Sequence, residues 1–300
     1  MSTIQTLIDA TAQGAVYALM AVGIGLVFGV LRLVNFAYGQ LVMAGAYTLA
    51  LTNGWNPAVS IVTCFAVVIG LTMTLELAAF RPLRNASPAT MLVATFAISF
   101  LLQSIAQLKF GVLGKTVGTL TGLNRPIGHG TLIVRWVWIV AIVVAALTLA
   151  ALLLLLNRTS LGLHMRAAAA DFGTARLLGV RANGVIAFAV LLSGVLAAMV
   201  AVILTTENPY VTSTYGLQET IIVLVGVVLG GLDRLWSATL GGFTIGFATG
   251  ALAGFLPSTG SWPFTSGVYL DSAVFGIVIL VLLLRPGGLF ARGQGAVERV

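Results

Sequence analysis

The sequence predicts an all-α integral membrane protein, a polytopic bundle of roughly 8–10 transmembrane helices. Of its 300 residues, 59% are hydrophobic and only 8% are charged, and the mean hydropathy is +1.08. Soluble domains carry about 25% charged residues. A membrane β-barrel would alternate apolar and polar residues, whereas the run 136–156 is apolar on all sides, which indicates helices.

A window of about 19 residues predicts about nine spans, and together they form one transmembrane domain over residues 1–300. The second, seventh and eighth spans are rich in glycine and polar residues, so we expect one or more of them to be broken or re-entrant. The predicted spans centre near Leu19, Gly45, Val68, Ile98, Val144, Leu196, Val225, Ile245 and Val278.

Arginines gather in the loop 81–84, in a longer loop at about 157–183 and in a tail at about 285–300. Basic residues favour the cytoplasmic side of a membrane, so these three segments are predicted inside and the N-terminus outside. The loop that contains Lys109 and Arg135 argues the other way, because the same scheme places it outside. No Lys or Arg precedes the first apolar run, which argues against a cleaved signal peptide.

Several chemistries are not expected. The net charge is +7, but the basic residues are spread over short loops rather than along one stripe, so nucleic acid is not an expected partner. Cys64 is the only cysteine, and the two histidines, His129 and His164, belong to no zinc motif, so no metal site is predicted. The sequence 114–116 resembles the end of a phosphate-binding loop, but Lys109 stands where the first glycine is required. We therefore expect no catalytic residues and no bound cofactor.

Glycines recur at every fourth position in two predicted spans, which allows another helix to approach closely. We expect helix packing inside the chain, with a subunit interface or a moving surface as the alternative. The glycines are Gly25 and Gly29 in the first span, and Gly242, Gly246, Gly250 and Gly254 in the eighth.

Polar side chains also occur inside predicted spans. Asn35, Tyr38 and Gln40 place two amides and a phenol in a stretch that is otherwise membrane-inserted. Because unpaired amides are costly in hydrocarbon, these side chains should face protein or a watery cavity, either as interhelical hydrogen bonds or as the lining of a translocation path. Glu76 lies about one turn before Arg81, where it could pair with an arginine or form an ion site, and Glu219 lies near the start of a span.

The loop at about 157–183 predicts a short helix that docks into another protein. Arg166 is followed by four alanines, Asp171 and an apolar stretch, and Gly179 falls where a left-handed helix cap is expected. A generic solvated loop would not need consecutive alanines beside apolar side chains.

Read together, these stretches resemble the LivH-type permeases of branched-chain amino-acid ABC importers over nearly the whole chain. The resemblance rests on the glycine-rich segment 14–29, the motif Asn-Phe-Ala-Tyr-Gly within 34–40, and the loop 166–180. It rests also on the glycine-rich turn at 229–231 and on the C-terminal motif at 285–290.

The resemblance implies the ABC importer permease fold and a location in the bacterial inner membrane. It also implies partners: cytoplasmic P-loop ATPase subunits that bind the ATP, a second permease that is identical or a paralogue, and a periplasmic substrate-binding protein. The chain itself would be a transport subunit and not an enzyme.

Carried over by position, the resemblance assigns two groups of residues. Arg166, Ala170, Asp171, Ala175 and Gly179 would contact the ATPase, and Asn35, Tyr38 and Gln40 would lie near the translocation path.

Departures from the family pattern keep alternatives open. Residues 233–236 replace the usual Gly-Ser turn, and the loop lacks the full Glu-Ala-Ala-Gly pattern of other importers. The substrate could therefore be urea or a short amide. A standalone ion-coupled secondary transporter would need Glu76 or Glu219 as its coupling carboxylate.

Overall fold

The computed structural model describes residues 3–31, 34–84, 86–119, 122, 126–127, 134–170, 172–179, 182–231 and 235–255, with isolated positions between 272 and 283. Its helices, in chain order, are α1 (Thr3–Leu31), α2 (Tyr38–Leu51), α3 (Pro57–Leu75), the π-helical turn η1 (Glu76–Phe80), α4 (Arg81–Leu83), α5 (Pro88–Phe110), α6 (Trp136–Arg158), α7 (Ser160–Ala170), α8 (Phe172–Leu177), α9 (Ala182–Glu207), α10 (Leu217–Gly230) and α11 (Leu235–Phe255).

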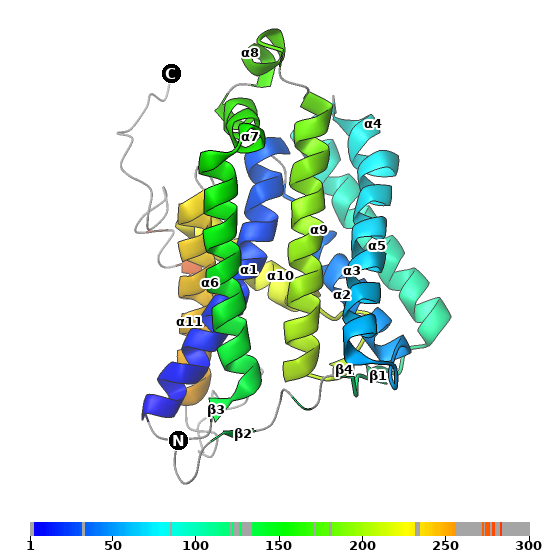
Figure 1. Ribbon diagram of the computed structural model, residues 1–300, viewed down its shortest axis with the longest axis vertical. Helices are drawn as coiled ribbons and strands as arrows, with labels where there is room; N and C mark the ends of the chain where they lie inside the picture. Colours follow the sequence, from blue (N-terminus) through cyan, green and yellow to red (C-terminus); the bar gives the residue numbers. More distant parts are fainter. Residues whose placement is uncertain are drawn as a thin grey trace.

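Two pairs of short antiparallel strands connect the helices. β1 (Lys115–Thr116) pairs with β4 (Tyr210–Val211), and β2 (Pro126–Ile127) pairs with β3 (Val134–Arg135). These strands lie at the end of the bundle that also holds the N-terminus (Figure 1). The arginine-bearing segments α4, α7 and α8 lie together at the opposite end, as the distribution of basic residues requires. Which end is cytoplasmic stays a prediction.

The all-helical membrane fold is confirmed. Within the described residues, 6 helices are long and apolar enough to cross a membrane, and α2 and α10 are shorter apolar helices. All but one of the predicted centres fall in these helices. The last, near Val278, falls where only isolated residues are described, and the predicted tail at 285–300 lies outside the described residues.

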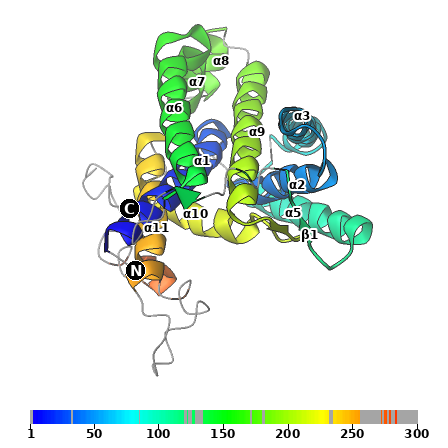
Figure 2. The ribbon, with the colours of Figure 1, turned by 60° about the horizontal axis from the view of Figure 1, so that its bottom comes forward.

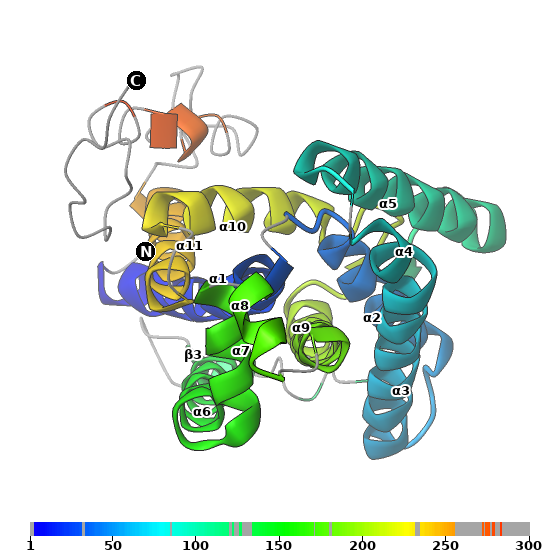
Figure 3. The same ribbon diagram turned by 90° about the horizontal axis from the view of Figure 1, so that it is seen from above.

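Two of the three spans that we expected to be irregular are short. α2 and α10 have 14 residues each, so each is roughly 21 Å long, less than a hydrocarbon core of about 30 Å. α10 lies across the bundle near half of its height, roughly perpendicular to α6 and α9 (Figures 1 and 3). The eighth predicted span is a regular 21-residue helix, α11.

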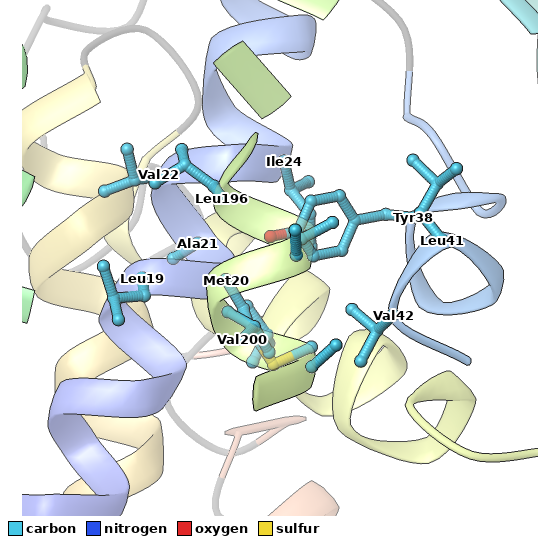
Figure 4. Packing of buried hydrophobic residues seen from close by; sticks show 14 of the residues in the cluster. Leu19, Met20, Ala21, Val22, Ile24, Tyr38, Leu41, Val42, Leu196 and Val200 are labelled. Carbon is cyan, nitrogen blue, oxygen red and sulfur yellow. The ribbon is translucent and has the colours of Figure 1, made fainter. Parts of the chain in front are cut away.

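α1 is the central helix of the bundle. It lies among α6, α9, α10 and α11 (Figure 2) and contacts all four. Its residues from Gly14 to Val27 are buried. Leu19, Met20 and Val22 belong to one apolar cluster with Leu196 of α9 (Figure 4). α3, α5 and α6 leave many apolar side chains exposed, which suits contact with lipid.

The glycine face of α11 packs against α1. A Cβ at Gly246 would lie 2.8 Å from the Cβ of Tyr17, and one at Gly250 would lie 2.6 Å from the Cα of Ala10. Gly242 meets Ala21 in the same way, and Gly254 meets Thr6. Only hydrogen fits at these positions, so the two helix backbones approach closely over about three turns, from Gly242 to Gly254.

The glycines of α1 differ from each other. A Cβ at Gly25 would lie 3.3 Å from Leu235 of α11, which is a close contact, whereas one at Gly29 would meet no described atom within 4 Å. Gly29 therefore takes no part in helix packing among the described residues.

Gly246→Ala should destabilise the protein, because its methyl group would overlap Tyr17 and the backbone of α1. Overpacking of this kind costs about 1–3 kcal/mol. Thermal unfolding of the detergent-solubilised protein measures the change. Gly70→Ala is the matched control: Gly70 is also within a helix but has no atom within 4 Å of a Cβ, so alanine should leave the stability unchanged or raise it. Equal losses in the two variants would contradict the assigned packing.

Candidate functional site

The loop at 157–183 contains two helices rather than the single one predicted. α7 begins after Thr159, whose hydroxyl accepts a hydrogen bond from the Gly162 amide at 3.1 Å and so caps the helix. Arg166 donates to the Asn157 side-chain oxygen at 3.0 Å. Met165 and Ala168 are buried, and α7 contacts α1 and α9. The helix is thus fixed to the two most central helices of the bundle.

α8 protrudes beyond the bundle at the same end (Figure 1). Its last residue, Leu177, is 89% exposed, and the following Leu178 is 79% exposed. Gly179 has φ +87°, the left-handed conformation that a helix-ending glycine adopts. Two adjacent leucines on a projecting turn form an apolar knob.

The residues predicted to contact an ATPase separate into different environments. The Arg166 side chain and Gly179 are exposed, whereas Ala175 is 4% exposed and faces inward. Ala170 is the last residue of α7, but its side chain, like all of Asp171, lies outside the described part of the chain. The sequence prediction did not include Leu177 and Leu178, although two leucines beside a solvated loop were a usable signal.

The residues predicted near a translocation path lie inside the bundle. Asn35 accepts a hydrogen bond from the Ala37 amide at 3.0 Å and so shapes the turn before α2. The Tyr38 ring extends from α2 toward Ile24 of α1, and a Cβ at Gly23 would lie 2.5 Å from its hydroxyl (Figure 4).

Tyr38 and Gln40 are fully buried, and within the described residues neither the phenol oxygen nor the Gln40 amide has a hydrogen-bond partner. Asn35 is also buried. A path along the outer surface of this chain would not reach these side chains directly, so their role in transport stays a prediction.

The starts of the two short helices meet next to this polar segment. A Cβ at Gly39 would lie 2.7 Å from the carbonyl oxygen of Gly216 and 2.8 Å from the hydroxyl of Thr220. Gly216 has φ +78°, which favours glycine, and it directly precedes α10. The first turn of α2 therefore packs closely against the start of α10.

Glu76 pairs with Arg84 rather than with the nearer Arg81. Glu76 lies in η1 with its side chain buried, and the Arg84 guanidinium contacts both Glu76 and the side chain of Asn183. Pro82 lacks an amide hydrogen and its ring would collide with a regular helical turn, which accounts for the wide turn before it. The cluster links the end of α3 to the start of α9, directly after the loop that carries α8.

Glu219 lies in the first turn of α10, where the helix dipole favours a carboxylate. It is partly exposed, and the neighbouring Gln218 is exposed. Among the described residues, no group of three or more His, Cys, Asp or Glu side chains could hold a metal ion.

The bundle of membrane-spanning helices, with two short internal helices and a helical projection at one end, has the fold of ABC transporter membrane subunits. A metal-chelate type ABC transporter in an inward-facing conformation has this fold, with TM-score 0.53, 19% identity, and coverage of 94% of this chain and 87% of the other. PsaBC from Streptococcus pneumoniae, solved in complex with Fab, has it with TM-score 0.50, 13% identity, and coverage of 93% and 91%.

The chain belongs to the family of permease components of branched-chain amino acid transport systems, whose model matches residues 6–283. The high-affinity branched-chain amino acid transport system permease protein BraD of Pseudomonas aeruginosa is 30% identical over 99% of this chain and 98% of its own. The corresponding permease protein LivH of Escherichia coli K12 is 27% identical over 99% and 97%. An archaeal relative from Methanocaldococcus jannaschii is 28% identical over 90% and 87%. The predicted family is thereby confirmed.

Arg84→Ala should destabilise the fold strongly, because it leaves the buried Glu76 carboxylate without its cation. Breaking one side of a buried pair costs about 3–5 kcal/mol. The control is Arg81→Ala, since the Arg81 side chain is exposed and its removal should change stability by less than about 0.5 kcal/mol. Thermal unfolding in detergent separates the two, and similar unfolding temperatures for both variants would rule out a structural role for the ion pair.

Proposed function

We propose that this chain is the membrane-spanning permease subunit of an ATP-binding-cassette importer of branched-chain amino acids in the bacterial inner membrane. Family membership over almost the whole chain supports the transport function and the substrate class. The single structural observation that carries ATP coupling is the exposed apolar knob on α8, at the end of the bundle that bears the arginines.

The knob fits a cytoplasmic ATPase as its partner. Leu177 and Leu178 would be poorly solvated on a free surface, and burial of a leucine side chain contributes about 1.5–3 kcal/mol. Arg166 is exposed on the adjacent α7 and can supply a charged contact at the rim. ATP would be bound by the partner, and this chain would receive only the motion.

The packing of α7 against the bundle provides a route by which a movement of the ATPase would reach the membrane helices. α7 packs on α1 and α9, and Asn183 at the start of α9 contacts Arg84, which directly follows α4. A displacement of α8 would therefore act on several spans as one body rather than on a loose loop. A second permease and a periplasmic binding protein complete the proposed assembly, and the binding protein would select the substrate.

A standalone ion-coupled transporter is less well supported. Its coupling carboxylate would have to be free to exchange partners, but the buried Glu76 side chain is paired with Arg84, whose guanidinium also contacts Asn183. A urea or short-amide importer remains the nearer alternative, because it would use the same architecture with a different binding protein.

Leu177→Asp should abolish the recovery of the ATPase subunit with this chain, because it places a charge in an apolar contact. The measurement is a mild-detergent purification of the tagged protein from its own host, with quantification of any bound P-loop ATPase. Leu177→Met, which keeps the volume and the apolar character, is the matched control and should retain the partner. Because Leu177 is 89% exposed, neither variant should alter the unfolding temperature.

Two outcomes would overturn this proposal. One is a partner-free wild-type protein that still accumulates leucine in liposomes under an ion gradient. The other is undiminished ATPase recovery by Leu177→Asp, which would remove α8 from the contact. In liposomes that hold the whole assembly, uptake of leucine but not urea would support the assigned substrate class.

A further inference from the structure

We infer that the outward face of α10 lines the translocation pathway. Gln218 forms its polar end, and Ile221, Val225 and Val228 form its apolar length, with Glu219 beside this face in the first turn of α10. The inference deepens the proposed function and rests on it, because a pathway wall has meaning only in a transport subunit. It assigns the pathway to residues other than Asn35, Tyr38 and Gln40.

The backbone that leads into α10 argues against contact with lipid. After β4, at the end of the bundle, the chain runs through the irregular segment 212–216 and reaches the start of α10 inside the bundle. Irregular backbone at membrane depth is tolerated only where protein covers it or where it borders a water-filled cavity. The left-handed Gly216 at this point packs on Gly39, so one side of the segment is covered by α2.

The inner face of α10 is fully used by packing. Thr220, Val223 and Val227 are buried. A Cβ at Gly226 would lie 2.5 Å from the Ile245 side chain of α11, and one at Gly230 would meet the backbone of Ser237. α10 is thus held rigidly against α2 and α11, with one defined face turned outward.

The outward side chains follow helical spacing. Gln218 is exposed, Val225 is partly exposed, and Ile221 and Val228 are 38% and 37% exposed. Positions 218, 221, 225 and 228 lie three or four residues apart, so they share one face of the helix. Ile222, which directly follows Ile221, is only 3% exposed, so the outward and inner faces of α10 differ sharply in exposure.

Polar groups concentrate at the start of this face. Gln218 lies there, and the partly exposed Glu219 follows it in the first turn of α10, on the side of Ile222. The adjoining segment contains the hydroxyls of Thr212 and Thr214, which lie 3.2 Å apart. Gln107 of α5 donates to Ser213 at 3.1 Å. An amide or a carboxylate in hydrocarbon is strongly unfavourable, so this end of the face must meet water or polar protein groups.

The arrangement suits an amino acid with a branched apolar side chain. The negative charge of Glu219, beside this face at the start of α10, would attract the α-ammonium group, and Ile221 and Val225 offer apolar contacts to the side chain. An acidic amino acid carries an additional negative charge, which the same carboxylate would repel. The face therefore favours the substrate class of the proposed function without forming a tight binding site.

The chain offers a clean background for testing this by thiol accessibility. Cys64 is its only cysteine and is fully buried, so Cys64→Ala provides a cysteine-free parent. Ile221→Cys and Ile222→Cys are then adjacent, chemically identical probes on opposite faces of α10. The reagent is a membrane-impermeant methanethiosulfonate, applied to the complete transporter from either side of the membrane.

Ile221→Cys should react more than about tenfold faster than Ile222→Cys, because only a hydrated thiol ionises to the reactive thiolate. Modification at position 221 should also block leucine uptake. If Ile221→Cys stays unreactive from both sides, or if both positions react equally, the pathway assignment is wrong. Labelling requires neither ATP nor uptake, so a reactive Ile221→Cys in a protein that shows no ATP-driven transport would instead count against the proposed function.

A second variant tests the charge at the polar end. Glu219→Gln keeps the shape of the side chain and should lower leucine uptake, while ATPase recovery stays at the wild-type level. Glu219→Asp is the matched control, since it keeps the negative charge in the first turn of α10 and should retain leucine uptake. Equal uptake by Glu219→Gln and the wild type would remove Glu219 from the pathway.

Discussion

The close approach of α11 to α1 is the constraint on which the rest of the bundle depends. Lipid tails are as apolar as leucine, so helices in a bilayer gain little from excluding lipid and associate through close van der Waals contact. The glycines from Gly242 to Gly254 provide that contact along most of α11. Because α1 is covered on this side, its other faces remain for α6, α9 and α10, and it becomes the shared centre of the structure.

α1 connects the two regions to which we assign a role in transport, α7 with α8 and the outward face of α10. α7 rests on α1 and α9 at one end of the bundle, while α10 packs against α11 and α1 near half-height. A rigid helix that touches both can carry a displacement between them without any change in its own conformation. The tight glycine contacts between α10 and α11 also favour transmission of a displacement, since a loosely packed α10 would absorb motion instead of passing it on.

The sequence predicted the fold class, nearly all helix positions and the family, because hydropathy and motif order report on them directly. It did not predict that α10 lies across the bundle, because hydropathy reports how apolar a segment is and not its direction. The polarity of Tyr38 and Gln40 showed that they avoid lipid, but polarity does not distinguish a water-filled path from the interior of the chain. The sequence predicted that Glu76 could pair with an arginine, which the ion pair with Arg84 confirms. It did not show which arginine, because Pro82 widens the preceding turn and changes which side chains meet.

The wide turn η1 also makes the Glu76 cluster sensitive to chain length. A π-helical turn holds one residue more than an α-helical turn, so residues 76–80 contain the equivalent of a single inserted amino acid. Deleting one residue there would require a regular helical turn, in which the ring of Pro82 would collide with the carbonyl group four residues before it. The segment between Glu76 and Arg84, which form the ion pair, would then be strained. A one-codon deletion would thus disturb the contact of Arg84 with Asn183 of α9, although it would leave the composition and hydropathy of the span almost unchanged.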